Sequence, residues 1–103
     1  MKSEKITKAD AEGALSSRER DDNYNTVVCR LAPRWRVIVC RQGIQWILQK
    51  AKAESGHGLV WRGFSYFLTR DALIKACARI DGPVDPDAMA ILHQLPERFR
   101  RSP

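Results

Sequence analysis

The feature that most constrains the fold is a change of hydrophobic period at Thr69. Between residues 26 and 68, β-branched, aromatic and aliphatic residues form short runs separated by Gly and Pro, which is typical of strands. After Thr69, apolar residues recur at helical spacing as far as Ile80, and Gly82 and Pro83 then supply a stop signal. Strands that are followed by helices along the chain indicate an α+β fold.

The first part of the strand region predicts three strands and one hairpin. Residues 26–31 have strand composition, and Pro33 ends this segment or confines it to the edge of a sheet. Residues 35–40 and 44–49 flank a turn that contains Gly43, whose backbone can reach the positive φ that tight hairpin turns need. We therefore expect antiparallel strands over this region.

Alternation within residues 44–49 assigns the side chains to two faces of the sheet. Trp46 shares one face with aliphatic neighbours and is predicted to lie in the core, whereas Gln45 and Gln49 lie on the opposite face. Amide side chains on that face are suited to contact phosphates, base edges or the backbone of a partner.

The remaining strand region predicts a loop and an irregular strand. Residues 51–58 contain two glycines and a serine, and we expect a frayed strand end that leads into a flexible loop. Residues 59–68 return to aromatic and aliphatic composition, and Gly63 within them indicates a bulge or a bend.

Two helices are predicted to follow. Thr69 caps the first, and Asp71 in its first turn faces the unpaired amides of the helix start. Asp85 caps the second, Pro86 occupies its first position and Pro96 ends it. The expected architecture is α+β, with a small antiparallel sheet of three to four strands (β-β-β(-β)-α-α) and two C-terminal helices packed on one face.

The 103 residues suffice for one domain with polar ends. Residues 1–25 are rich in charge and in Ser, Asp and Asn, and their isolated apolar residues cannot offset the entropy of ordering. We expect a mobile polar arm at residues 1–25, a single α+β domain at residues 26–99 and a basic tail at residues 100–103.

The net charge of +6 is concentrated in the predicted strands. Residues 26–70 carry eight Lys and Arg against one Glu, an excess of +7. Residues 1–25 carry five basic against six acidic residues, giving −1, and residues 71–103 carry five of each sign. Clustered basic residues on a sheet favour contact with phosphates or with an acidic protein surface.

The candidate binding residues combine charged, amide and aromatic groups of this region. Trp61, next to Arg62 and after the glycine loop, is the candidate for an exposed aromatic on which a base can stack, whereas core burial is the alternative. The alternative for the arginines is a solvated face that keeps the edge strands soluble. The predicted nucleic-acid or partner-binding residues are Arg34, Arg36, Arg41, Gln45, Gln49, Lys50, Lys52, Trp61 and Arg62.

No motif of metal, cofactor or catalytic chemistry is present in the sequence. The soft ligands are three cysteines and two histidines, and none falls in a C-x-x-C or H-x(3–5)-H pair. We predict that Cys40 and Cys77 are buried as small apolar residues and that His57 is exposed in its glycine-flanked loop. No nucleophile signature and no phosphate-binding glycine loop occur. We expect no catalytic site, no metal and no cofactor.

The setting that the sequence favours is a reducing cytoplasm. Three widely spaced cysteines are unlike the even, dense pattern of a disulfide-stapled secreted domain. No window reaches the roughly 20 apolar residues that span a bilayer, and the start of the chain lacks an apolar run of signal-peptide length. Neither export nor contact with a membrane is expected.

Several motifs carry a resemblance to a family. They are W-R-V-I at residues 35–38, G-I-Q-W-I-L-Q at residues 43–49 and T-R-D-A-L-I at residues 69–74. With these motifs, residues 34–99 resemble a group of small, uncharacterised bacterial proteins, many of them encoded near mobile or phage-derived genes. The resemblance implies a shared fold and a bacterial cytoplasmic setting, and it carries no assigned activity.

Two functional hypotheses remain. The first is a non-enzymatic module that binds nucleic acid through a basic sheet face. The second is a protein-interaction module, such as a phage or mobile-element inhibitor or accessory protein, that docks through the same face or through a strand edge. The two differ in their expected response to salt, which weakens phosphate contacts steeply.

Overall fold

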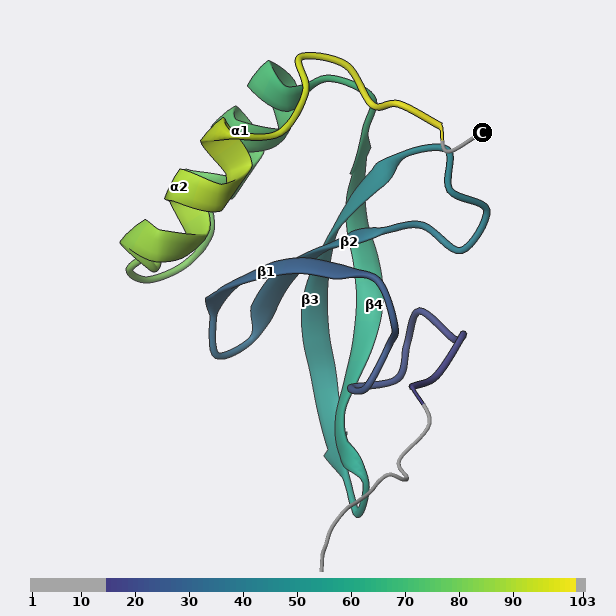
Figure 1. Cartoon of the computed structure of the whole chain (residues 1–103). Coiled ribbons are helices and arrows are strands. Elements are labelled where there is room, and N and C mark those ends of the chain that lie inside the picture. The colour runs from purple at the N-terminus through teal and green to yellow at the C-terminus, as the bar shows by residue number, and fades with distance from the viewer. Residues whose placement is uncertain (1–14, 102–103) are drawn as a thin grey trace, which may run out of the picture.

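The chain forms a four-stranded antiparallel sheet with two helices on one face, in a computed structural model that describes residues 15–101 (Figure 1). The strands are β1 (Val27–Ala32), β2 (Trp35–Val39), β3 (Trp46–Ser55) and β4 (Gly58–Phe67), and the helices are α1 (Arg70–Cys77) and α2 (Pro86–His93). The strands lie in the order β1-β2-β3-β4, so that each is joined to its neighbour by a hairpin. The predicted α+β fold is confirmed.

The β2–β3 turn agrees with the sequence expectation. Gly43 has a φ of 68°, and its amide donates a hydrogen bond to the carbonyl of Cys40 at 2.9 Å. A residue with a Cβ is strained in this left-handed conformation, which is why glycine suits the position. The turn brings Val39 opposite Trp46 and sets the register of the two central strands.

The β3–β4 hairpin differs from the expected flexible loop at residues 51–58. β3 continues to Ser55, which pairs directly with Gly58 across a two-residue turn. The Ser55 hydroxyl accepts from the amide of His57 at 3.1 Å and donates to the carbonyl of Gly58 at 3.2 Å. The loop prediction was wrong because pairing with β4 overrides the weak strand propensity of the Ala, Lys and Glu residues.

Two bulges bend this long hairpin. Leu48 pairs with Ser65 and Gln49 with Gly63, which leaves Phe64 as an extra residue in β4. The bulge expected near Gly63 is therefore confirmed, and a second register shift in β3 adds Lys52. Because an extra residue disrupts the alternation of side chains, each bulge turns a side chain away from the regular pleat.

The helices cover one face of the sheet and form the main core with it. Buried residues of β1, β2 and β3 pack there against Leu73 and Cys77 of α1 and Ala88 and Leu92 of α2. Both predicted caps are present, because the Thr69 side chain accepts from the backbone of residue 72 and Asp85 from that of residue 87. The sheet side of this core is formed by Cys29, Leu31, Trp35, Val37, Trp46 and Leu48.

The C-terminal residues return to this core after α2. The ring of Phe99 contacts the Trp46 ring edge-on at 5.0 Å, and the Phe99 amide donates to the carbonyl of Leu68 at 2.7 Å. A bridge between Thr69 and Arg98 continues the outer edge of β4. Within residues 15–101, no helix has the length and apolarity needed to cross a membrane.

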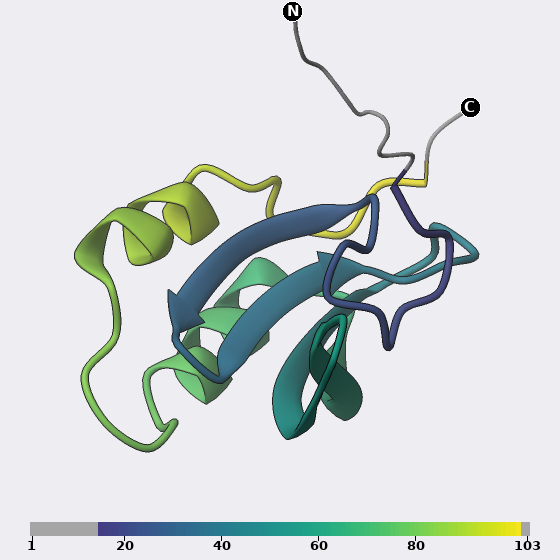
Figure 2. The ribbon, with the colours of Figure 1, turned by 90° about the horizontal axis from the view of Figure 1, so that it is seen from below.

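A compact loop covers the other face of the sheet (Figure 2). The amide of Ser16 donates to the carbonyl of Asn23, and the amide of Asn25 donates to the carbonyl of Ser16, so the two ends of residues 16–25 lie together. We call this segment the N-terminal loop. Tyr24 anchors it beside Ile38 and Ile47, and the Tyr24 hydroxyl donates to the carbonyl of Val39 at 2.8 Å.

The N-terminal loop corrects the prediction of a mobile arm at residues 1–25. Residues 1–14 lie outside the described residues, but residues 16–25 belong to the folded unit, and Tyr24 is 4% exposed. The loop has little apolar surface of its own. It is held instead by polar contacts with side chains of the sheet, which are part of the site described next.

Candidate nucleic-acid interface

Arg36 in β2 lies at the centre of the face that the N-terminal loop covers. Its guanidinium donates to the carbonyls of Glu19 at 3.0 Å, Asp21 at 2.9 Å and Asp22 at 3.1 Å, and to the side chain of Gln49 at 2.7 Å. Burial lowers the pKa of Arg36 to about 10, which leaves the side chain protonated at pH 7. A buried cation thus binds the loop backbone to the sheet, since backbone carbonyls satisfy its donors.

Gln49 and Trp61 complete the attachment from β3 and β4. The Gln49 amide donates to the carbonyl of Glu19 at 2.9 Å, and the Trp61 indole donates to the carboxylate of Asp22 at 2.9 Å. The Arg36 guanidinium lies 4.3 Å from the centroid of the Trp61 ring, within cation–π range. The indole hydrogen bond is the main reason why the pKa of Asp22 is lowered.

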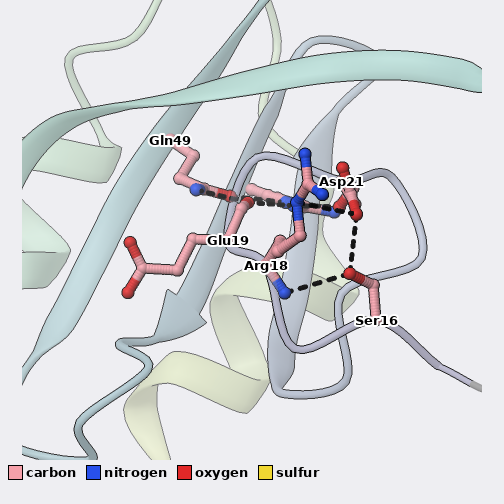
Figure 3. Close-up of polar contacts among 6 residues, drawn as sticks. Ser16, Arg18, Glu19, Asp21 and Gln49 are labelled. Carbon is pink, nitrogen blue, oxygen red and sulfur yellow. Dashed lines mark hydrogen bonds and ion pairs between the residues drawn. The ribbon is translucent and has the colours of Figure 1, made fainter.

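The loop is also braced internally, as Figure 3 shows. The Ser16 hydroxyl donates to the Asp21 carboxylate at 2.6 Å and accepts from the Arg18 amide at 3.0 Å. The Arg18 guanidinium lies 3.8 Å from the same carboxylate. Outside the loop, the Glu19 carboxylate accepts from the backbone amide of Arg41 at 2.6 Å, which ties the loop to the β2–β3 turn.

A cleft of about 470 Å³ lies between the N-terminal loop, the β2–β3 turn and β4. We call it the arginine cleft, because its walls carry Arg18, Arg20, Arg41 and Arg62. Gln49, Trp61 and Gly63 also line it, and Glu19 is its one acidic lining residue. Four cations against one anion give this cleft a local excess of positive charge.

Three of the four arginines in the cleft have free guanidinium groups. Within residues 15–101, the side chains of Arg20, Arg41 and Arg62 have no ion pair or hydrogen bond, and all three are exposed. The backbone carbonyl of Arg20 accepts from the Trp61 amide at 2.9 Å, which holds this residue at the edge of β4. Unneutralised guanidinium groups that share one cleft attract anions and match the geometry of phosphate oxygens.

A second basic cleft, of about 460 Å³, adjoins the first across β4. We call it the lysine cleft, and Lys50, Lys52, Arg62, Gly63 and Phe64 line it. Arg62 and Gly63 line both clefts, so the two meet at this point of the edge strand. Lys50 lies 3.7 Å from the carboxylate of Asp81, a surface ion pair that solvent screens.

The structure separates the predicted site residues into three groups. Arg41 and Arg62 line the arginine cleft, and Lys50, Lys52 and Arg62 line the lysine cleft. Arg34, in the β1–β2 turn, and Gln45, before β3, line neither cleft. The third group is buried and consists of Arg36, Gln49 and Trp61, which are 2%, 1% and 1% exposed.

The exposure that we expected for Arg36 and Gln49 was therefore wrong, and for Trp61 the alternative of core burial holds. Arg36 and Gln49 do lie on the face opposite Trp46, but the N-terminal loop covers that face and uses their hydrogen-bonding groups. Trp61 is buried because its indole also binds the loop. Gln49 and Trp61 lie at the buried base of the arginine cleft, and Arg36 lies beneath them. A bound ligand therefore cannot stack on Trp61.

Sequence reasoning missed two arginines and the exposed aromatic residues. Arg18 and Arg20 belong to the segment that we predicted as a mobile arm, yet they form one wall of the arginine cleft. Phe64 and Tyr66 of β4 are 62% and 57% exposed. One local signal was available in the sequence. Within residues 16–25, Arg18 and Arg20 are the only basic residues and alternate with acidic ones.

The comparisons with known proteins add no relative. No protein-family model, no curated protein and no solved structure matches the chain. Within residues 15–101, no three His, Cys, Asp or Glu side chains come together as metal ligands. The three cysteines, including the predicted Cys40 and Cys77, are buried, and His57 is exposed as expected.

Proposed function

We propose that the protein binds nucleic acid through the arginine cleft. The observation that carries this proposal is the set of three unpaired guanidinium groups, from Arg20, Arg41 and Arg62, that share one cleft. Gathering like charges costs free energy when no anion is bound, and a phosphate backbone removes that cost.

The test is a salt titration of oligonucleotide binding followed by fluorescence anisotropy. We expect single- or double-stranded probes to bind at about 0.01 M ionic strength and to be released steeply towards about 0.15 M, because phosphate contacts displace counterions. Absence of binding to both probes at the lower ionic strength overturns the proposal.

A pair of double variants locates the binding surface. Arg41→Gln with Arg62→Gln removes two positive charges from the cleft, and Arg34→Gln with Lys75→Gln removes two from elsewhere on the surface. Each lost phosphate contact reduces the slope of log K against log salt by roughly 0.7 to 0.9. We expect a slope about 1.5 smaller for the first pair and an unchanged slope for the second. Equal losses in both pairs would show that net charge, and not the cleft, controls binding.

A protein-interaction module is the second candidate, and one observation favours it. Phe64, Tyr66 and Leu68 are each more than half exposed at the end of the edge strand β4. Exposed apolar residues on a sheet edge are typical of strands that pair with another chain. Binding that persists unchanged between low and physiological salt would favour this candidate over nucleic acid.

A further inference from the structure

The aromatic residues of β4 bear on which form of nucleic acid fits the two clefts. This inference rests on the proposed function, because it concerns the ligand of the same surface. Tyr66 pairs with Ile47 in the sheet and therefore lies on the face of the arginine cleft. Phe64 packs edge-on against Trp35, with ring centroids 5.0 Å apart, on the helix-bearing face where the lysine cleft begins.

Tyr66 lies against Gly63, which lines the arginine cleft, because residue 63 has no side chain. A Cβ placed on Gly63 would meet the Tyr66 hydroxyl and would lie 3.0 Å from the ring carbon that bears it. Gly63 itself lines the arginine cleft. The hydroxyl end of Tyr66 thus lies next to Gly63 at the border of the arginine cleft, and the residue is 57% exposed. Within residues 15–101, the hydroxyl of Tyr66 has no hydrogen-bond partner.

Phe64 is the matching residue of the lysine cleft. The bulge turns it out of the regular pleat, and contact with Trp35 on one side leaves it 62% exposed. Lys50 and Lys52 lie with it in the same cleft. The lysine cleft therefore combines cations with an exposed aromatic ring, and Tyr66 adjoins the arginine cleft at Gly63. The two clefts meet at Arg62 and Gly63.

We propose that the ligand is a single-stranded nucleic acid that crosses β4 from the arginine cleft to the lysine cleft, with bases stacked on Tyr66 and Phe64. In a duplex the faces of the bases are already stacked on one another, so exposed rings gain little from it. In a single strand the faces are free, and an aromatic ring beside a cation can contact a base and its phosphate together.

The test compares three probes that share the same number of phosphates: an oligothymidine about 15 nucleotides long, an abasic strand of that length, and a hairpin duplex of that total length. We expect the oligothymidine to bind the full-length protein about a hundredfold more tightly than the abasic strand, because only the former has bases to stack and each of the two rings contributes about tenfold. Duplex binding that equals or exceeds oligothymidine binding overturns this inference and leaves the proposed function standing. Failure of all three probes to bind overturns the proposed function itself.

Variants of Tyr66 assign the effect to a residue. Tyr66→Leu keeps apolar bulk and removes the aromatic face. We expect this variant to bind oligothymidine about tenfold more weakly than the wild type does, and to bind the abasic strand with an affinity within about twofold of the wild-type value. Tyr66→Phe keeps the ring and should bind as the wild type does, since the hydroxyl has no partner in the fold. If Tyr66→Leu binds oligothymidine as tightly as Tyr66→Phe does, Tyr66 is not a stacking residue and the path is wrong.

Phe64→Leu provides the same test in the lysine cleft. Because Phe64 contacts Trp35, the thermal midpoint of this variant is measured alongside binding. A weaker affinity for oligothymidine at a temperature where the variant is fully folded supports the crossing path. An unchanged affinity restricts the ligand to the arginine cleft and overturns the crossing.

Discussion

Replacing Arg36 by Met tests whether a buried cation holds the N-terminal loop on the sheet. Methionine fills much of the same space, but it removes all four hydrogen bonds that the guanidinium donates to Glu19, Asp21, Asp22 and Gln49. A buried acceptor that loses its donor costs about 1–3 kcal/mol. Four such costs add up to about 4–12 kcal/mol, which is comparable to the whole stability of a small domain.

The expected loss is smaller than this sum, because the loop can move away. Once the loop leaves the sheet, its three carbonyls form hydrogen bonds with water, and the penalty falls mainly on Gln49 and on the exposed Trp61 ring. We therefore expect the free energy of unfolding to fall by about 3 kcal/mol. Since 1 kcal/mol shifts the melting temperature of a domain of this size by about 4–8 °C, the midpoint should drop by at least about 12 °C.

Urea unfolding followed by tryptophan fluorescence measures this loss, and Arg41→Met is the matched control. Arg41 is exposed, and its guanidinium has no partner within residues 15–101, so its replacement should change stability by less than about 0.5 kcal/mol. Limited trypsin digestion should also cleave Arg36→Met after Arg18 and Arg20 faster than it cleaves the wild type. A stability within 1 kcal/mol of the wild type, with unchanged cleavage, would refute the role of Arg36 as the attachment point of the loop.

Three further changes test the fold. Gly58→Ala should lower the free energy of unfolding, measured in urea, by about 1–3 kcal/mol. The reason is that Gly58 has a φ of 111° and that a Cβ there would lie 2.5 Å from the Asp22 carboxylate. An unchanged stability would contradict the close approach of the N-terminal loop to the β3–β4 hairpin. Asp85→Ala should cost about 1 kcal/mol, since Asp85 caps α2 by accepting from the Asp87 amide at 3.0 Å, whereas Asp85→Asn should retain most of the stability. Burial raises the pKa of Cys29 to about 11 and of Cys77 to about 12, so the folded domain keeps protons that the unfolded chain loses above about pH 9. The free energy of unfolding should therefore fall from pH 8 to pH 10. Thiol reagents at pH 8 should label both cysteines only as fast as the domain unfolds. Rapid labelling of the native protein would contradict the burial of these thiols.

The elements with strong local signals were predicted correctly from the sequence. The caps at Thr69 and Asp85, the turn at Gly43 and the bulge near Gly63 each depend on the chemistry of one or two residues. Such features are encoded locally, because a cap or a positive φ needs no distant partner. The extension of β3 to Ser55 was missed because this part of the strand is stabilised by pairing with β4 and only weakly by its own composition.

The site was predicted only in part, because burial on the polar face depends on a distant segment. Gln49 was placed on the correct face, but alternation of side chains does not indicate which segment covers that face. The covering segment is polar and binds through backbone carbonyls, which carry no sequence signal. The choice between an exposed and a buried Trp61 could not be made for the same reason, since Asp22, 39 positions away, accepts the hydrogen bond of its indole.

The N-terminal loop supplies both the carbonyls that surround Arg36 and the side chains of Arg18 and Arg20 in the arginine cleft. The arginine cleft is therefore complete only in molecules whose N-terminal loop is docked on the sheet, so one equilibrium governs both. The apparent dissociation constant of a ligand that needs these arginines equals its intrinsic value divided by the fraction of molecules whose loop is docked. By linkage, a bound anion must in turn hold the loop on the sheet, so the segment that closes one face of the domain also sets how tightly that face binds.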